Sequence, residues 1–226
     1  MTTTNKFLEK IKQHRSSKKE KKFSGCLEDY LQLLEENKDI AALAHKRLYD
    51  QILSHGLTTL DDGDHRCSKI FDGEEVKVYD YFASQFFGME RPLEKVMRFL
   101  RSAAMKGEES RQVLLLLGPV GAGKSALVEH IKGALEECEP AYALEGCPIR
   151  EEPLHLIPRS LRDDFAETYG VKIEGDLCPV CRHRLINEFE GDYTKFPITQ
   201  SSFSVRGRKG VGVVPPMDPN TQDTSL

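Results

Sequence analysis

The sequence predicts an α/β fold in which helices pack on a parallel sheet, and three observations support this prediction. Residues 113–117 (V-L-L-L-L) are consecutive apolar residues with the length and composition of a buried strand. A glycine-rich stretch, residues 118–125, follows directly, and residues 126–137 then have helical periodicity. Because residues 141–144 form a second short apolar segment, we expect a strand parallel to the first one after a helical crossover.

The residues ahead of this unit predict a separate helical part. Residues 5–57 carry apolar side chains at helical spacing, and Ser24-Gly25 is the expected break between two helices. Residues 58–77 contain two clusters of acidic residues with a glycine, which are typical of turns, and few apolar side chains that could be buried, so they indicate a connector. We therefore expect a helical extension and connector over residues 1–78 and a core over residues 79–226, with an insertion at about 145–215.

Composition excludes several classes of protein. The chain has 226 residues and a formal net charge of −4 at pH 7, so a general affinity for nucleic acid is not expected. No apolar run approaches a membrane span, and the polar N-terminus lacks the apolar region of a secretory signal. We expect a cytoplasmic protein without a membrane partner, whose six cysteines stay reduced.

The glycine-rich stretch G-P-V-G-A-G-K-S is typical of a loop that wraps a polyphosphate (the Walker A pattern). Gly121 and Gly123 leave room for main-chain N–H groups and allow backbone angles that a Cβ would forbid. The helix that follows directs its unpaired N–H groups and its positive dipole end at the same anion. Lys124 is then placed to reach the β- and γ-phosphates, and Ser125 to bind Mg²⁺. The expected contacts to ATP are Gly118, Pro119, Val120, Gly121, Ala122, Gly123, Lys124, Ser125 and Ala126. The alternative is a glycine turn that only joins a strand to a helix.

Residues 79–104 contain the expected contact for the base. Aromatic residues lead to Gly88 and to an amphipathic helix with Pro92 in its first turn. In nucleotide-binding proteins of the AAA+ type, an apolar-Gly-apolar segment ahead of such a helix lies against adenine. Phe87-Gly88-Met89 has this form, so we expect Phe87 and Gly88 to contact adenine; an ordinary helix entry with a packed phenylalanine is the alternative. The predicted fold is thus a P-loop NTPase three-layer sandwich of the AAA+ type, incomplete in this chain.

The remaining residues are less regular. Three prolines interrupt residues 145–158, and a helix over residues 160–169 should end at Gly170. A β-hairpin is expected from residues 196–205 and 210–214 around the basic turn at 206–210. That turn, with Arg206, Arg208 and Lys209, is interpreted either as solvated or as a contact to a polypeptide or nucleic-acid substrate in the pore of an oligomer. Arg159 and Arg162 are candidates for contacts to neighbouring phosphates.

Cys178-Pro-Val-Cys181 is the second motif with chemical content. Two thiolates at this spacing can bind one Zn²⁺ from a tight turn, but a structural zinc needs four ligands. Cys147, His155 or His183 are candidates to complete the site, as is a second chain. A redox pair and two partly buried thiols are the alternatives.

Four segments together resemble the PrkA-type serine protein kinases, specifically their N-terminal AAA domain. These segments are F-F-G-M-E-R-P-L-E-K-V, G-P-V-G-A-G-K-S, G-C-P-I-R-E-E-P-L-H-L-I-P and M-D-P-N-T-Q-D. The resemblance runs from Phe7 to Asp223. It implies an AAA+ P-loop core, ATP as ligand, a protein substrate, and an ATP-dependent serine/threonine protein kinase acting in bacterial stress or starvation.

The chain also departs from that family. Its members are much longer, and their acidic ATPase strand, sensor residues and kinase-like region lie beyond the point that corresponds to Leu226. Glu145 and Glu188 are weak candidates for the acidic metal partner, so we assign no catalytic residue and expect a truncated or split member that binds nucleotide. Three functions stay open: the ATP-binding part of a kinase, a remodelling or protease-linked motor, and a non-catalytic nucleotide-sensing or zinc-linked module. A homo-oligomer or a downstream partner chain is expected.

Overall fold

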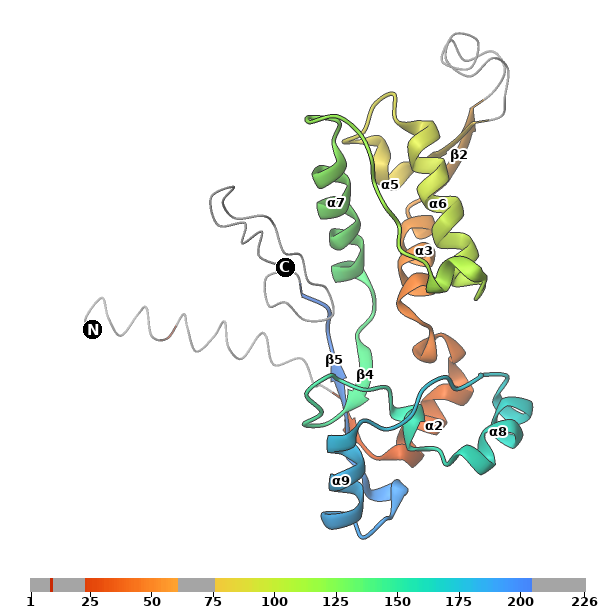
Figure 1. Cartoon of the computed structure of the whole chain (residues 1–226), viewed down its shortest axis with the longest axis vertical. Helices are drawn as coiled ribbons and strands as arrows, with labels where there is room; N and C mark the ends of the chain where they lie inside the picture. Colours follow the sequence, from red (N-terminus) through yellow and green to blue (C-terminus); the bar gives the residue numbers. More distant parts are fainter. Residues whose placement is uncertain (1–8, 10–22, 61–75, 205–226) are drawn as a thin grey trace, which may run out of the picture. The chain divides into compact units, whose positions relative to one another are not determined.

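A computed structural model of the chain describes residues 9, 23–60 and 76–204 (Figure 1). The described residues fall into two compact units, which we call unit 1 and unit 2. Unit 1 combines the residues up to Ala41 with Pro140–Ser201, and unit 2 is built on Ala42–Glu139. By spatial contact the chain therefore groups differently from the expected division at residues 78 and 79.

Unit 2 is built mainly from helices. Its elements are α3 (Ala44–Ser54), β2 (Leu57–Leu60), β3 (Val76–Tyr79), α5 (Asp80–Ala83), α6 (Glu90–Ala104), the 3₁₀ turn η2 (Glu108–Arg111) and α7 (Lys124–Glu137). Helix α3 packs beside both α6 and α7 (Figure 1). Strands β2 and β3 form an antiparallel pair in which Leu57 lies opposite Tyr79.

The core of unit 2 follows from the spacing of its apolar residues. Helix α6 buries Leu93, Val96, Met97 and Leu100, which lie at i, i+3, i+4 and i+7 on one face. These side chains belong to one buried cluster with residues of α3, α5 and α7. The helix predicted after Gly88 and the helix predicted after the glycine-rich loop are both confirmed.

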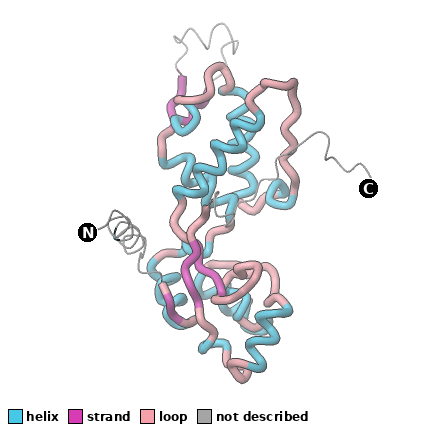
Figure 2. The backbone as a smooth tube through the Cα atoms, turned by 90° about the vertical axis from the view of Figure 1, so that its left-hand side faces the viewer, coloured by secondary structure: helices cyan, strands magenta, loops and turns pink. Residues whose placement is uncertain are grey.

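Unit 1 holds a three-stranded antiparallel sheet (Figure 2). Its elements are β1 (Ser24–Gly25), α2 (Leu27–Glu36), η1 (Lys38–Ala41), β4 (Ala141–Leu144), η3 (Pro153–Leu156), η4 (Arg159–Leu161), α8 (Arg162–Tyr169), α9 (Pro179–Asn187), η5 (Tyr193–Lys195) and β5 (Ile198–Ser201). The strand order is β1-β5-β4, and Leu144 of β4 lies opposite Ile198 of β5, both fully buried. Helix α8 ends at Gly170, whose φ of +70° is the left-handed conformation expected of a glycine in that position.

Two predictions about the sheet are wrong. Strand β4 has the predicted bounds, but it pairs antiparallel with β5 instead of lying parallel to residues 113–117. Residues 113–117 form no strand, and Val113 and Leu117 are 90% and 84% exposed. A strand needs a neighbour for its backbone N–H and C=O groups, and no described strand pairs with this segment.

Other expectations lie outside the described residues or differ in detail. The basic turn at residues 206–210 and the second strand of the expected hairpin are outside the described ranges, whereas β5 supplies a strand within its first part. Ser24-Gly25, the expected break between two helices, forms the short strand β1 ahead of α2. None of the described helices combines the length and the apolar character that a bilayer crossing requires.

Candidate functional site

The glycine-rich loop adopts the backbone conformation that its glycines allow. Gly121 has a φ of +84° and Gly123 a φ of +76°, both in the left-handed region that residues with a Cβ disfavour. Gly123 is the residue that immediately precedes α7, so the chain turns sharply from the loop into the helix. The prediction that these two positions require glycine is therefore supported by their geometry.

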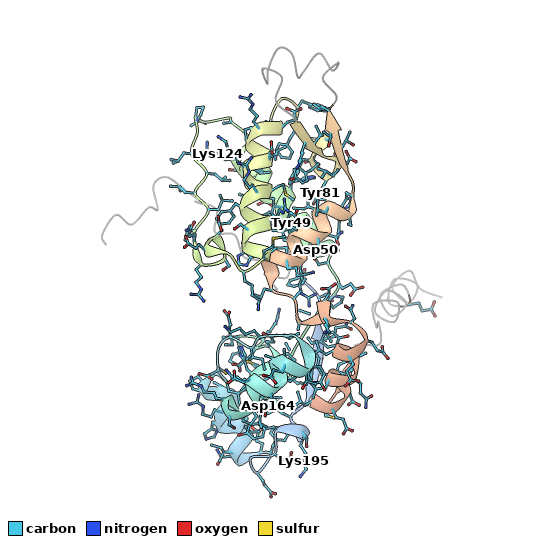
Figure 3. The ribbon with its side chains drawn as sticks, turned by 90° about the vertical axis from the view of Figure 1, so that its right-hand side faces the viewer. Tyr49, Asp50, Tyr81, Lys124, Asp164 and Lys195 are labelled. Carbon is cyan, nitrogen blue, oxygen red and sulfur yellow. The ribbon has the colours of Figure 1, made fainter. Side chains whose placement is uncertain are left out.

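Lys124 closes the loop (Figure 3). Its Nζ donates hydrogen bonds to the carbonyl oxygen of Gly118 at 2.8 Å and to that of Pro119 at 2.6 Å. The N–H of Ala122 also donates to the Pro119 carbonyl, at 3.3 Å. Since an ammonium group has three N–H donors, Lys124 can hold the loop with two of them and offer the third to an anion.

The beginning of α7 provides the rest of an anion site. The first N–H groups of a helix have no partner within the helix, and the dipole of this 14-residue helix is positive at that end. Its first turn contains no acidic side chain, so nothing there repels an anion. Ser125, the second residue of α7, is exposed and can present its hydroxyl to a metal ion bound with the phosphates.

The segment expected to contact adenine borders this loop. A Cβ added to Gly123 would lie 3.7 Å from Sδ of Met89 and 4.0 Å from the ring of Phe86. Phe86 is buried, whereas Phe87 is 80% exposed, and Gly88 has a φ of +70°. Phe86 and Phe87 are among the residues that line a small cavity of about 100 Å³, and no residue of the glycine-rich loop lines it. The structure thus brings residues 86–89 next to the loop and leaves one aromatic face uncovered.

Tyr81 and His130 join the two halves of this site, and the sequence did not single them out. The hydroxyl of Tyr81 donates to the backbone carbonyl of His130 at 2.8 Å, and Nε2 of His130 lies 2.9 Å from the carbonyl of Tyr81. Their rings are 4.4 Å apart, and the His130 ring also packs on Phe82 and Phe86. Burial raises the pKa of Tyr81 to about 12, so its hydroxyl remains a donor at neutral pH. No short motif marks this pair, because 49 residues separate its members.

Several other candidates belong to unit 1, whereas the glycine-rich loop belongs to unit 2. Arg159 and Arg162 both pair with Asp176, Arg162 at 3.2 Å. Hydrogen bonding from Arg159 is the main cause that lowers the pKa of Asp176 to about 2. Glu145 and Glu188 also belong to unit 1, where Glu188 follows α9 and accepts a hydrogen bond from Arg184.

The Cys-Pro-Val-Cys motif lies at the beginning of α9. The fold brings it together with Cys147, one of the candidates expected to complete the site, and with Glu151, which was not expected. One ligand atom of each of Cys147, Glu151, Cys178 and Cys181 lies within 4.8 Å of the others; we call these residues the cysteine–glutamate cluster. Burial acts to raise the pKa of Cys147, but hydrogen bonds to its sulfur, first from the N–H of Glu151, hold that pKa below its usual value. Burial raises the pKa of Cys181. His155 contacts Glu151 instead of joining the cluster, and His183 is exposed.

Comparison with known proteins identifies the family. The model of the PrkA AAA domain matches residues 25–226. A protein of Bacillus subtilis (strain 168) named ATP-dependent protease PrkA is 36% identical over 222 residues, which are 96% of this chain and 33% of that protein. A protein of Escherichia coli (strain K12) named serine/threonine kinase YeaG is 30% identical over 208 residues, which are 88% of this chain and 32% of that protein.

The chain therefore spans about a third of the length of these curated relatives. No solved structure matches the chain. The family match covers the glycine-rich loop, the segment beside it and the cysteine–glutamate cluster alike. The chain belongs to the family of PrkA AAA domains.

Proposed function

We propose that this chain binds ATP with Mg²⁺ and serves as the nucleotide-binding part of a serine/threonine protein kinase. The observation that carries the proposal is the phosphate loop: two left-handed glycines, Gly121 and Gly123, curl the backbone around the ammonium group of Lys124 at the positive end of α7. Lys124 would bind the β- and γ-phosphates, and the Ser125 hydroxyl would bind the metal ion. Residues 118–126 would surround the phosphates.

The adenine would lie against Phe87 and Gly88. Phe87 exposes most of an aromatic side chain beside the loop, and exposed aromatic faces stack favourably on bases. The pair formed by Tyr81 and His130 would keep α5, and with it residues 86–89, at a fixed distance from α7. The site therefore combines a rigid support with one open aromatic face.

Substitution of Lys124 tests this proposal. Lys124→Ala removes one charge-assisted hydrogen bond to phosphate, which is worth about 1.5–3 kcal/mol, so the affinity for ATP should fall about 10- to 150-fold. Lys95→Ala is the matched control, because Lys95 is an exposed lysine on α6 of the same unit. Titration with a fluorescent ATP analogue and Mg²⁺ gives both affinities. Equal affinities of the two variants, or no saturable binding by the folded wild-type chain, would overturn the proposal.

A second candidate is ATP-dependent proteolysis, because the relative from Bacillus subtilis carries that name. Both candidates use the same nucleotide site, and both need a protein substrate. For the native protein, transfer of labelled γ-phosphate to serine or threonine of a protein substrate supports the kinase. If the substrate is instead cleaved only when ATP is present, and no labelled phosphate appears on protein, the result supports the protease.

We also propose that the chain assembles into a homo-oligomer or with a second chain. Measuring the mass in solution with and without ATP tests this proposal.

A further inference from the structure

We propose that the cysteine–glutamate cluster of unit 1 is a zinc site, with three thiolates and one carboxylate as ligands to a single Zn²⁺. Cys147 and Glu151 come from the turn after β4, and Cys178 and Cys181 come from the first turn of α9. The site is distinct from the proposed ATP site, whose residues belong to unit 2.

The spacing of the sulfurs fits a tetrahedral zinc ion. Sγ of Cys147 lies 3.9 Å from Sγ of Cys178. With Zn–S bonds of about 2.3 Å and tetrahedral angles, two thiolate ligands lie about 3.8 Å apart. The same distance is far too long for a disulfide, whose sulfurs lie about 2.05 Å apart.

Glu151 provides the second, independent observation. Its side chain is only 2% exposed, and Oε1 accepts hydrogen bonds from the N–H of Cys178 at 2.7 Å and pairs with Nδ1 of His155 at 3.1 Å. Oε2 is buried as well, but no described residue gives it a hydrogen bond. Leaving a buried carboxylate oxygen without a partner costs about 1–3 kcal/mol or more. One carboxylate oxygen of Glu151 lies within 4.8 Å of the three sulfurs. A cation held there would remove this cost if Oε2 joined its ligands, since carboxylate oxygen binds Zn²⁺ at about 2.0–2.2 Å.

The groups around the cluster support thiolates and orient the carboxylate. The N–H of Glu151 donates to Sγ of Cys147 at 3.4 Å, and the N–H of Cys181 donates to Sγ of Cys178 at 3.3 Å. Such N–H···S hydrogen bonds stabilise the negative sulfur that a metal needs. His155 contacts the Glu151 carboxylate through Nδ1, and its Nε2 lies 2.9 Å from the backbone carbonyl of Glu174. His155 therefore orients the carboxylate without being a ligand itself.

The consequence for the fold is a cross-link within unit 1. Residues 145–158 contain three prolines and only one short 3₁₀ segment, so regular hydrogen bonding holds them weakly. A zinc ion would tie this segment to α9 across 31 residues of sequence, beside the buried side chains of Leu154 and Leu185. The softness of three thiolates favours zinc over magnesium or calcium.

Metal analysis of the full chain tests the proposal. After gel filtration in chelator-free buffer, wild type should carry about one zinc per chain, and addition of a strong chelator should make about three more thiols reactive. Cobalt(II) in place of zinc should give the intense thiolate-to-cobalt band and the visible bands of a tetrahedral site. These measurements use wild type alone, so they do not depend on how a variant folds.

Matched variants locate the site. Cys178→Ser should lose the bound zinc, whereas Cys138→Ser should keep it, because Cys138 is a similarly half-buried thiol of unit 2. Glu151→Gln keeps the shape of the side chain and should lower zinc affinity at least about tenfold, whereas Glu167→Gln on the exposed side of α8 should not. Metal-free wild type with three reactive thiols, a disulfide within the cluster, or iron in place of zinc would overturn the assignment. ATP titration of the same samples is independent of this result.

Discussion

Replacing Gly123 with alanine tests the geometry of the phosphate loop. Gly123 has φ +76° and ψ 5°, directly before α7. The new Cβ would lie 3.7 Å from Sδ of Met89 and 4.0 Å from the ring of Phe86, which are ordinary van der Waals contacts. The cost of the substitution therefore comes from the backbone and not from a steric clash.

The magnitude follows from that backbone angle. An alanine in the left-handed conformation costs about 1–2 kcal/mol relative to the right-handed one. Part of this cost is offset, because alanine lowers the conformational entropy of the unfolded chain by the equivalent of about 0.4–1 kcal/mol. We expect a net loss of about 1 kcal/mol, which lowers the Tm of a unit of this size by about 4–8 °C. If residue 123 instead relaxes to a right-handed conformation, the free energy of unfolding is unchanged, but the loop loses its shape and the affinity for ATP falls.

The assay measures both quantities on the same samples. Thermal unfolding followed by circular dichroism gives the Tm, and titration with a fluorescent ATP analogue gives the affinity. Gly133→Ala is the control, because Gly133 lies inside α7, where alanine is favoured by about 0.5–1 kcal/mol. Its Cβ would come 3.3 Å from the Tyr81 hydroxyl, so a small shift of that ring reduces the gain.

The two variants should therefore differ in the size of their loss. Gly123→Ala should lose stability or ATP affinity, and Gly133→Ala should lose neither by more than about 0.5 kcal/mol. A Gly123→Ala variant with unchanged Tm and unchanged ATP affinity would refute the left-handed conformation at this position and its role in the loop.

Two further predictions concern single hydrogen-bonding groups. Tyr81→Phe removes the donor to the His130 carbonyl and should lower the free energy of unfolding by about 1 kcal/mol, measured by urea denaturation; a change below about 0.3 kcal/mol would contradict the bond. Asp176→Asn should remove an ion pair whose carboxylate has its pKa lowered from 3.8 to about 2. Because the folded-state pKa is the lower one, the advantage of wild type should be present above pH 3.8 and be lost as the pH falls through about 2. Thermal unfolding of wild type and Asp176→Asn across this pH range tests the prediction. A Tm difference between the two proteins that persists unchanged at pH 2 would contradict it.

Local features of the site could be predicted from the sequence, because neighbouring residues determine them. The glycine-rich loop and the beginning of α7 follow from residues 118–126, and the left-handed angles of Gly121 and Gly123 follow from the absence of a Cβ. The helix end at Gly170 is local in the same sense. Short-range rules were sufficient for each of these features.

Features that depend on distant contacts could not be predicted in this way. The orientation of β4 depends on its pairing with β5, which lies more than fifty residues further along the chain. The cysteine–glutamate cluster likewise needs the turn after β4 to meet α9. The sequence therefore revealed Cys178 and Cys181 and offered Cys147 only as one of several candidates, and it left Glu151 without a role. The pair formed by Tyr81 and His130 is a third contact of this kind.

The exposed apolar residues 113–117 affect how nucleotide affinity should be interpreted. They are covalently continuous with Gly118, so any partner that orders this stretch also restricts the loop that follows it. Ordering the stretch beforehand removes part of the entropy that ATP binding would otherwise lose. We therefore expect the affinity measured on these 226 residues alone to be a lower bound for the affinity in an assembly that covers residues 113–117.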